Sequence, residues 1–241
     1  MVDLDTKDED FVTTFLTATM HSDVLFFTDK GKAYQVKMYE LPEGRRATKG
    51  KSIMNFLSVD SNEKVTSVLA MPKEAKKLSL SLLMITKNGV AKRVDAEAFH
   101  DVRRSGLIAI TLQEGDELKA VSFCAPESEA IIATSKGQSI RFKESDIRVM
   151  GRGAAGVRAI KLGKGDSVVG ADVIKKDAKN QAFLVISQNG YGKKTDLGEY
   201  KTQNRGGSGI KTMKVTSKTG DIIASKVVTE EEEEIVAISK K

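Results

Sequence analysis

The sequence predicts an all-β protein, a propeller-like array of four-stranded blades with about four complete blades and a partial one. Glycines in turns recur at regular intervals, a second glycine follows each, and short apolar or alternating runs lie between them. The turn glycines are Gly31, Gly89, Gly137 and Gly190, and the second glycines are Gly50, Gly106, Gly156 and Gly209. A sheet of this size cannot bury its apolar face alone, so we expect neighbouring blades to stack.

Each unit begins with a short apolar run, and a second apolar run then leads to the turn glycine. The second runs read VLFFTDKG, LLMITKNG, IIATSKG and LVISQNG, with Thr or Ser three residues before the glycine. Asn-Gly between apolar runs is a strong hairpin signal, because glycine accepts a positive φ. We therefore predict tight hairpin turns at Asn88-Gly89 and at Asn189-Gly190.

The remaining two elements of each unit follow the turn glycine and the second glycine. The runs after the second glycine are KSIMNFL, LIAITL, VRAIKL and IKTMKV, and FVTTFLTA at 11–18 resembles the first run of a unit. Alternation with period two favours strands, and no long helix is expected. The predicted blades, all within a single domain 1–241, are 12–64, 65–117, 118–167 and 168–221, with a partial blade at 222–241.

The charge is distributed unevenly along the 241 residues. Lys and Arg number 39 and Asp and Glu 33, which gives a net charge of +6, yet five acids lie in residues 1–10 and five in Glu230–Glu234. A basic body between acidic ends suggests a polyanionic partner. The hydrophobic content of 40% excludes a wholly disordered chain. The short apolar runs exclude a transmembrane helix, and no signal peptide is expected.

Residues suited to catalysis or metal binding are few. The single cysteine, Cys124, and two distant histidines, His21 and His100, argue against a disulfide or a zinc site. Residues 151–156, GRGAAG, satisfy a dinucleotide-binding pattern, but a strand-like run follows where a helix is needed. Residues 44–52 have one residue too many for a phosphate-binding P-loop. We predict a core position for Cys124, and no cofactor, metal or catalytic residue.

Basic residues recur at equivalent places in the units, above all at the turn before the second glycine. Exposed strands are often charged, but a radial array would place these turns along one rim, which suits a long, curved polyanion. The aromatic content of 5% and the absence of Trp disfavour a single-strand binder, so contacts to a duplex backbone fit better. The predicted DNA-binding residues are Arg45, Arg46, Lys49, Lys51, Arg93, Arg103, Arg104, Arg141, Lys143, Arg152, Arg158, Lys193, Lys194, Arg205 and Lys211.

Three stretches, residues 21–57, 141–166 and 187–215, resemble the C-terminal domain of bacterial DNA gyrase A proteins, with the A-type subunit of topoisomerase IV as the close alternative. The resemblance implies a β-pinwheel, in which blades exchange strands. It also implies sequence-nonspecific wrapping of duplex DNA around a basic rim, which assists negative supercoiling. The implied partners are the gyrase A breakage-reunion domain and the gyrase B protein, in the bacterial cytoplasm near the nucleoid.

The resemblance further implies that the chain is not an enzyme on its own, since the catalytic tyrosine and the ATP site belong to other parts of the enzyme. The family's Gln-Arg-Arg-Gly-Gly-Lys-Gly box is not found in residues 1–20, although QNRGGSG at 203–209 is related to it. We therefore expect binding of linear duplex without constraint of supercoils. A protein-interaction propeller with a merely solvated rim is the rival hypothesis, and steep salt dependence of DNA binding would distinguish the two.

Overall fold

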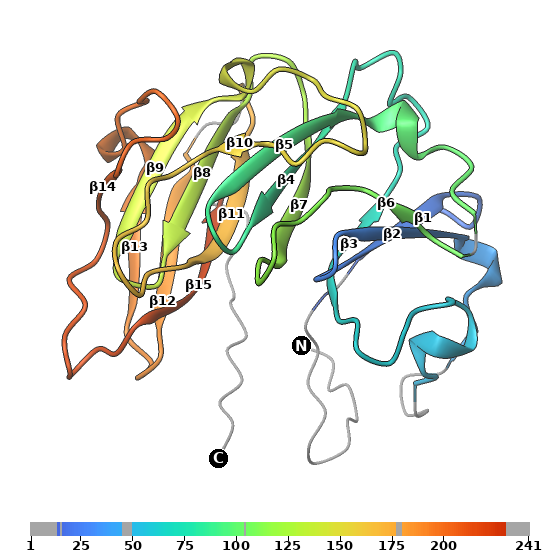
Figure 1. Cartoon of the computed structure of the whole chain (residues 1–241), viewed down its shortest axis with the longest axis horizontal. Coiled ribbons are helices and arrows are strands. Elements are labelled where there is room, and N and C mark those ends of the chain that lie inside the picture. The colour runs from blue at the N-terminus through green and yellow to red at the C-terminus, as the bar shows by residue number, and fades with distance from the viewer. Residues whose placement is uncertain (1–13, 15, 45–49, 104, 177–179, 230–241) are drawn as a thin grey trace.

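The computed structural model describes residues 14, 16–44, 50–103, 105–176 and 180–229. These residues form four antiparallel sheets, three of four strands and one of three, which follow one another around an open arc (Figure 1). The all-β, propeller-like class predicted from the sequence is confirmed. The helices among the described residues are single 3-10 turns: η1 (Met38–Glu40), η2 (Ile53–Asn55), η3 (Ala96–Phe99), η4 (Glu144–Asp146) and η5 (Leu197–Glu199).

The four sheets share one strand order, which is read from the concave side of the arc outward. The first sheet has β3 (Val65–Ala70), β1 (Asp23–Thr28), β2 (Lys32–Lys37) and β6 (Leu107–Ile108). The second has β7 (Leu118–Cys124), β4 (Ser81–Thr86), β5 (Val90–Asp95) and β10 (Val157–Arg158). The third has β11 (Val168–Ile174), β8 (Glu129–Thr134), β9 (Gln138–Lys143) and β14 (Ile210–Lys211). The fourth has β15 (Ile222–Val228), β12 (Ala182–Ser187) and β13 (Gly192–Asp196).

Each sheet takes strands from two consecutive units of the sequence. In the first sheet β1 and β2 come from one unit, whereas the inner strand β3 and the outer strand β6 come from the next. The inner strands β3, β7, β11 and β15 contact one another in succession. The outer strands pair in one register, Leu107 with Ala33, Val157 with Ala91 and Ile210 with Ser139. The sequence had grouped the four strands of a blade within one unit, so the predicted blade bounds describe the repeat and not the sheets.

The predicted hairpin turns at Asn88-Gly89 and Asn189-Gly190 are confirmed. Gly89 has a φ of +79° and Gly190 a φ of +80°. Their amides donate to the carbonyls of Thr86 at 3.1 Å and Ser187 at 3.0 Å, three residues earlier. The recurring spacing of Thr or Ser before the glycine therefore reflects the closing hydrogen bond of one turn type, used in every sheet.

The run at 51–57 differs from the strand expected there. Ile53–Asn55 form a 3-10 turn, and the Ser52 hydroxyl accepts a hydrogen bond from the Met54 amide at 3.4 Å. The three equivalent runs are strands because each pairs with the sheet before it. No described sheet precedes the first unit, so this run lacks the partner that would hold it extended. Half of the run at 11–18 and all of Glu230–Glu234 lie outside the described residues, and the described residues 14 and 16–18 form no strand.

The core lies between the sheets as well as within them. One buried cluster joins Leu25 and Phe27 of the first sheet to Leu82 and Met84 of the second, and two further clusters join later sheets in the same way. Cys124 is buried and unpaired, as predicted, and burial raises the pKa of its thiol. Because adjacent sheets share their apolar clusters, the arc is held together by the hydrophobic effect along its length.

Candidate nucleic-acid interface

Basic side chains project from the outer edge of the second and third sheets. In each exchanged strand the first residue packs inward and the second faces solvent, and at the second position stand Arg158 and Lys211. Exposed lysines continue from both strands. We call this set the outer basic row: Arg158, Lys161, Lys164, Lys211 and Lys214. Their side chains form no hydrogen bond or ion pair with any other described residue.

Several lysines elsewhere on the arc pair with acids, unlike those of the outer basic row. Lys32 pairs with Glu63 and, at 3.0 Å, with Asp60, and these carboxylates raise the pKa of Lys32. Lys136 pairs with Asp221 at 2.7 Å. Lys87 with Glu117 and Lys226 with Asp172 form further pairs, each at 3.1 Å. The outer basic row differs from these lysines in that none of its five side chains pairs with a described carboxylate.

Among the described residues, the outer edge of the first sheet does not carry this charge. The positions equivalent to Arg158, Lys161 and Lys164 are Ile108, Thr111 and Glu114. Ile108 is among the most exposed apolar side chains, with 59% of its surface accessible. The candidate interface therefore covers the second and third sheets, where the outer strand β10 is yellow and the outer strand β14 is orange in Figure 1.

Two of the predicted arginines at the recurring turn connect consecutive repeats. Arg152 donates to the carbonyl of Ala98 at 3.1 Å. Arg205, one repeat later, donates to the equivalent carbonyl of Asp146 at 2.8 Å and to that of Arg158 at 3.0 Å. The recurrence of arginine at this turn consequently has a structural cause, alongside the predicted contact with DNA.

Arg93 and Arg141 form a second equivalent pair, and both are half-buried between sheets. Arg93 forms an ion pair with Glu144, and Arg141 forms one with Glu129. Arg141 also donates to the carbonyl of Leu197 at 2.8 Å. These guanidinium groups are already engaged within the protein, and their contact with DNA stays a prediction.

The other predicted residues lie at scattered positions. Lys193 donates to the carbonyl of Thr212 at 3.1 Å. Four are exposed side chains that bind no other described residue: Lys51, Arg103, Lys143 and Lys194. Four lie outside the described residues: Arg45, Arg46, Lys49 and Arg104.

Lys92 is a buried basic residue that the sequence did not single out as a site. Its side chain is 0% exposed, and its ammonium donates to the carbonyl of Ala109 at 2.8 Å and to that of Arg152. Burial lowers its pKa to about 8. Lys161, Lys164 and Lys214 were also missed, although the three-residue spacing from Arg158 and from Lys211 could have found them.

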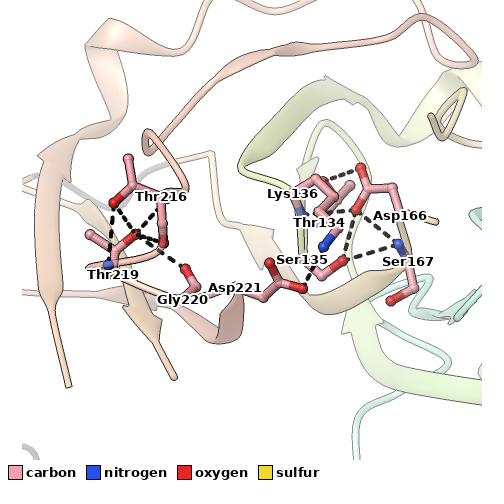
Figure 2. Close-up of polar contacts among 9 residues, drawn as sticks. All are labelled: Thr134, Ser135, Lys136, Asp166, Ser167, Thr216, Thr219, Gly220 and Asp221. Atoms are coloured by element: carbon pink, nitrogen blue, oxygen red, sulfur yellow. Dashed lines mark hydrogen bonds and ion pairs between the residues drawn. The ribbon is translucent and has the colours of Figure 1, made fainter. Parts of the chain in front are cut away.

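Carboxylates hold the loops behind the outer edge in place, as Figure 2 shows for the third and fourth sheets. Asp166 accepts hydrogen bonds from the hydroxyls of Thr134 at 2.8 Å and Ser135 at 2.9 Å and from the amide of Lys136 at 2.9 Å. The Lys136–Asp221 ion pair then reaches the loop that begins β15. The loop that follows Lys164 is thereby tied to its hairpin.

The structure places the other motifs in turns and on the surface. Residues 151–156 form a loop that leads into the strand β10. Within the described ranges, no three His, Cys, Asp or Glu side chains gather as a metal site would require. Nor does any helix there have the length and apolar character to span a membrane.

Comparison with known proteins places this architecture in one family. The family model described as "DNA gyrase C-terminal domain, beta-propeller" matches residues 22–70, 80–125, 128–175 and 181–240. The chain is 41% identical over 233 residues to the DNA gyrase A protein of Staphylococcus epidermidis, a match that covers 97% of this chain and 26% of that protein. This chain therefore spans about a quarter of the length of the gyrase A proteins that it matches.

Solved structures show the same fold. The crystal structure of the C-terminal domain of DNA topoisomerase IV superposes with a TM-score of 0.82 at 26% identity, over 95% of this chain and 70% of that one. The DNA gyrase A C-terminal domain superposes with a TM-score of 0.74 at 24% identity, over 88% of this chain and 68% of that one.

Proposed function

Because the chain belongs to the DNA gyrase C-terminal domain family, we propose that it binds duplex DNA along its outer edge without reading the base sequence. It acts as a non-catalytic domain of an ATP-dependent type IIA topoisomerase. Its contribution there is to wrap DNA so that the enzyme can introduce negative supercoils. On this proposal it works in the bacterial cytoplasm, with the gyrase A breakage-reunion domain and with the gyrase B protein.

The outer basic row is the observation that supports the proposal most directly. Its five side chains are exposed, carry no partner among the described residues, and lie on consecutive sheets of a curved array. Lys and Arg on such a surface neutralise phosphates and release condensed counterions, which gives affinity that does not depend on sequence. The convex side of an arc also suits a duplex that bends around it.

Bending sets the energetic requirement for wrapping. Curving a 20–30 bp duplex by 40–90° costs about 1–6 kcal/mol. Contacts spread over the edges of two sheets can offset part of this cost, but the first sheet offers Ile108 and Glu114 at the equivalent places. We therefore expect the chain to bind linear duplex and to leave the linking number of ligated nicked circles unchanged. A strong topoisomer shift would show that the described edge suffices for wrapping.

The binding experiment compares charge removal on the outer row with charge removal elsewhere. Fluorescence anisotropy with duplexes of unrelated sequence is measured over a range of salt concentrations. For the double variant Arg158→Gln, Lys161→Gln we expect a weaker affinity for every duplex and a salt slope smaller by about 1.8, or about 0.9 for each lost phosphate contact. The matched control, which also removes two charges, is the double variant Lys73→Gln, Lys119→Gln, at exposed lysines after the inner strand β3 and on the inner strand β7.

The control variant should bind with the affinity and salt slope of the unchanged protein. Equal losses in the control and in the outer-row variant would mean that net charge, and not the outer edge, determines binding. Retention of binding at high salt with no slope would favour the protein-interaction hypothesis.

A further inference from the structure

Each basic turn of the outer edge rests on the exchanged segment of the repeat before it, the run that contains the outer strand of the preceding sheet. Residues 151–156 pack on the segment 107–112, and residues 203–209 pack on the equivalent segment 157–162. Both turns lead directly into an outer strand, β10 or β14, that carries a member of the outer basic row. The place of each turn therefore sets where the cations of this edge lie.

The later turn, residues 203–209, binds its segment directly. The amide of Gly206 donates to the carbonyl of Ala159 at 2.6 Å. The guanidinium of Arg205 donates to the carbonyl of Arg158 at 3.0 Å. Two bonds from the turn itself thus hold it against the backbone of the exchanged segment.

The earlier turn, residues 151–156, is joined to its segment by a buried ammonium group instead. Lys92 donates to the carbonyl of Ala109, the residue equivalent to Ala159, at 2.8 Å, and to the carbonyl of Arg152 in the turn. Among the described residues no backbone amide of this turn donates to Ala109. The Lys92 ammonium therefore takes the place of the direct bonds and bridges segment and turn.

A backbone bond that both turns share shows the same difference. The amide of Lys161 donates to the carbonyl of Gly207 at 2.8 Å, whereas the equivalent bond from Thr111 to the carbonyl of Ala154 is 3.4 Å long. The earlier turn is thus held less closely by its backbone, which leaves room for the ammonium between the turn and its segment.

The residue at the position of Lys92 matches the way each turn is held. In the third sheet, where the turn binds directly, this position is Ile140, which has no donor. Both side chains are 0% exposed, so a lysine is not required there to fill solvent-exposed space. Burial lowers the pKa of Lys92 to about 8, which leaves its ammonium largely protonated at pH 7. A charged donor forms the stronger hydrogen bonds that a bridge between two backbones needs.

We propose that Lys92 is a positioning residue for DNA binding, which acts by fixing the turn 151–156. The turn carries Arg152 and leads to Arg158, whose partner in the sheet is Val90, two residues before Lys92. Both guanidinium groups are thereby placed for the duplex by a side chain that is itself fully buried. The inference rests on the proposed binding of duplex along the outer edge.

Cleavage by trypsin tests the positioning without DNA. The Arg152–Gly153 bond is exposed, and its carbonyl is the one that Lys92 binds. For Lys92→Met we expect cleavage there to be at least about tenfold faster, the value of one charge-assisted hydrogen bond in the opening of the turn. The matched control Lys119→Met, on the inner strand β7 of the same sheet, should be cleaved like the unchanged protein. If Lys92→Met does not fold, Thr111→Val should speed the same cleavage, because it removes the hydroxyl that donates to the Gly153 carbonyl at 2.9 Å.

Duplex affinity tests the link from Lys92 to DNA. At about 0.1 M salt, Lys92→Met should bind every duplex about eightfold more weakly, with a salt slope smaller by about 0.9, the value of one phosphate contact. In a chain that already carries Arg152→Gln and Arg158→Gln, the same substitution should change the affinity by less than about twofold, because the contacts that Lys92 places are gone. An equal loss in both backgrounds would show that Lys92 does not act through these arginines.

Chemical rescue separates the ammonium group from the volume of the side chain. Lys92→Cys in a Cys124→Ala background is alkylated in urea with bromoethylamine or with bromopropane and then refolded, which leaves an ammonium or a methyl group at the same place. The aminoethyl protein should regain the affinity and the slow cleavage of the unchanged side chain, and the propyl protein should behave like Lys92→Met.

Two results would overturn the inference alone: equal behaviour of the two alkylated proteins, or unchanged cleavage in Lys92→Met while the unchanged chain binds duplex. Absence of duplex binding by the unchanged chain would refute the proposed function, and with it the role of Lys92 in DNA binding, whatever the cleavage rates.

Discussion

Replacement of Gly137 by alanine should measure what an exchanged strand contributes to stability. Gly137 has a φ of +89°, and its β-carbon position lies against the carbonyl of Met213. Gly165 also has a left-handed φ, +70°, but no described residue lies within 4 Å of its β-carbon position. The two substitutions share the backbone cost and differ only in whether the exchanged segment is displaced.

The magnitude follows from the contacts at Gly137. A left-handed alanine costs about 1–2 kcal/mol at either position. At Gly137 the methyl group also displaces the amides of Thr212 and Met213, which donate to the Gly137 carbonyl at 2.9 and 3.5 Å. These two bonds contribute about 0.5–1.5 kcal/mol each, and the half-buried Met213 and Val215 side chains about 1–2 kcal/mol together. We expect losses of about 3–7 kcal/mol for Gly137→Ala and about 1–2 kcal/mol for Gly165→Ala.

Urea unfolding monitored by far-ultraviolet circular dichroism gives both losses in free energy of unfolding. Gly190→Ala adds a second control, because that turn has the same φ without a covering segment among the described residues. If Gly137→Ala proves too unstable to fold, Gly31→Ala and Gly89→Ala provide the same comparison at other junctions. Equal losses for Gly137→Ala and Gly165→Ala would refute the view that strand exchange carries a large share of the stability.

Three further outcomes are expected. Burial lowers the pKa of Lys92 to about 8 from its ordinary 10.5, so the unfolded state binds more protons than the folded state between these pH values. The free energy of unfolding should therefore rise with pH in that window. Urea titrations at a series of fixed pH values should show this rise, and Lys92→Met should flatten it. The buried Cys124 thiol, whose pKa burial raises, should react with Ellman's reagent no faster than the protein unfolds; prompt reaction in the native state would contradict its core position. Arg205→Ala should lower the free energy of unfolding by about 1.5–3 kcal/mol, because the hydrogen bonds to two carbonyls are lost. Substitution of the exposed Lys201 by alanine should change it by less than about 0.5 kcal/mol. Equal melting temperatures for the two variants would contradict the structural role of Arg205.

The residues of the hairpin turns allowed the fold class to be predicted from the sequence. A Thr or Ser three residues before a glycine indicates a hairpin turn. The hydrogen bond that closes this turn and the glycine with the left-handed φ both lie within the same four residues. Alternation around Gly89 and Gly190 then identified the paired strands. These signals are local and do not depend on distant contacts. Because they recur four times, a chance match at one turn does not change the predicted fold class.

The membership of the sheets and the role of the arginines depend on distant contacts. Leu107 and Ala33 pair across more than a whole repeat, and the sequence offers no short-range signal for that choice. For the same reason 51–57 was expected as a strand. Arg141 was grouped with exposed arginines, although it binds Glu129 in its own sheet and the Leu197 carbonyl of the next. Periodicity predicts which residues are equivalent, but it does not predict which of them face a neighbour.

Because the following repeat completes each sheet, a sheet cannot be completed during synthesis until that repeat has emerged from the ribosome. Ala33 is ready to pair soon after synthesis, but its partner Leu107 emerges about 70 residues later, roughly 4–15 s at bacterial rates of about 5–20 residues per second. During that interval the nascent chain exposes an unpaired strand edge on the sheet that it has most recently formed. The strand β13, with the successive residues Lys193 and Lys194 on its two faces, has the polar and cationic character that discourages an unpaired edge from pairing with the wrong chain.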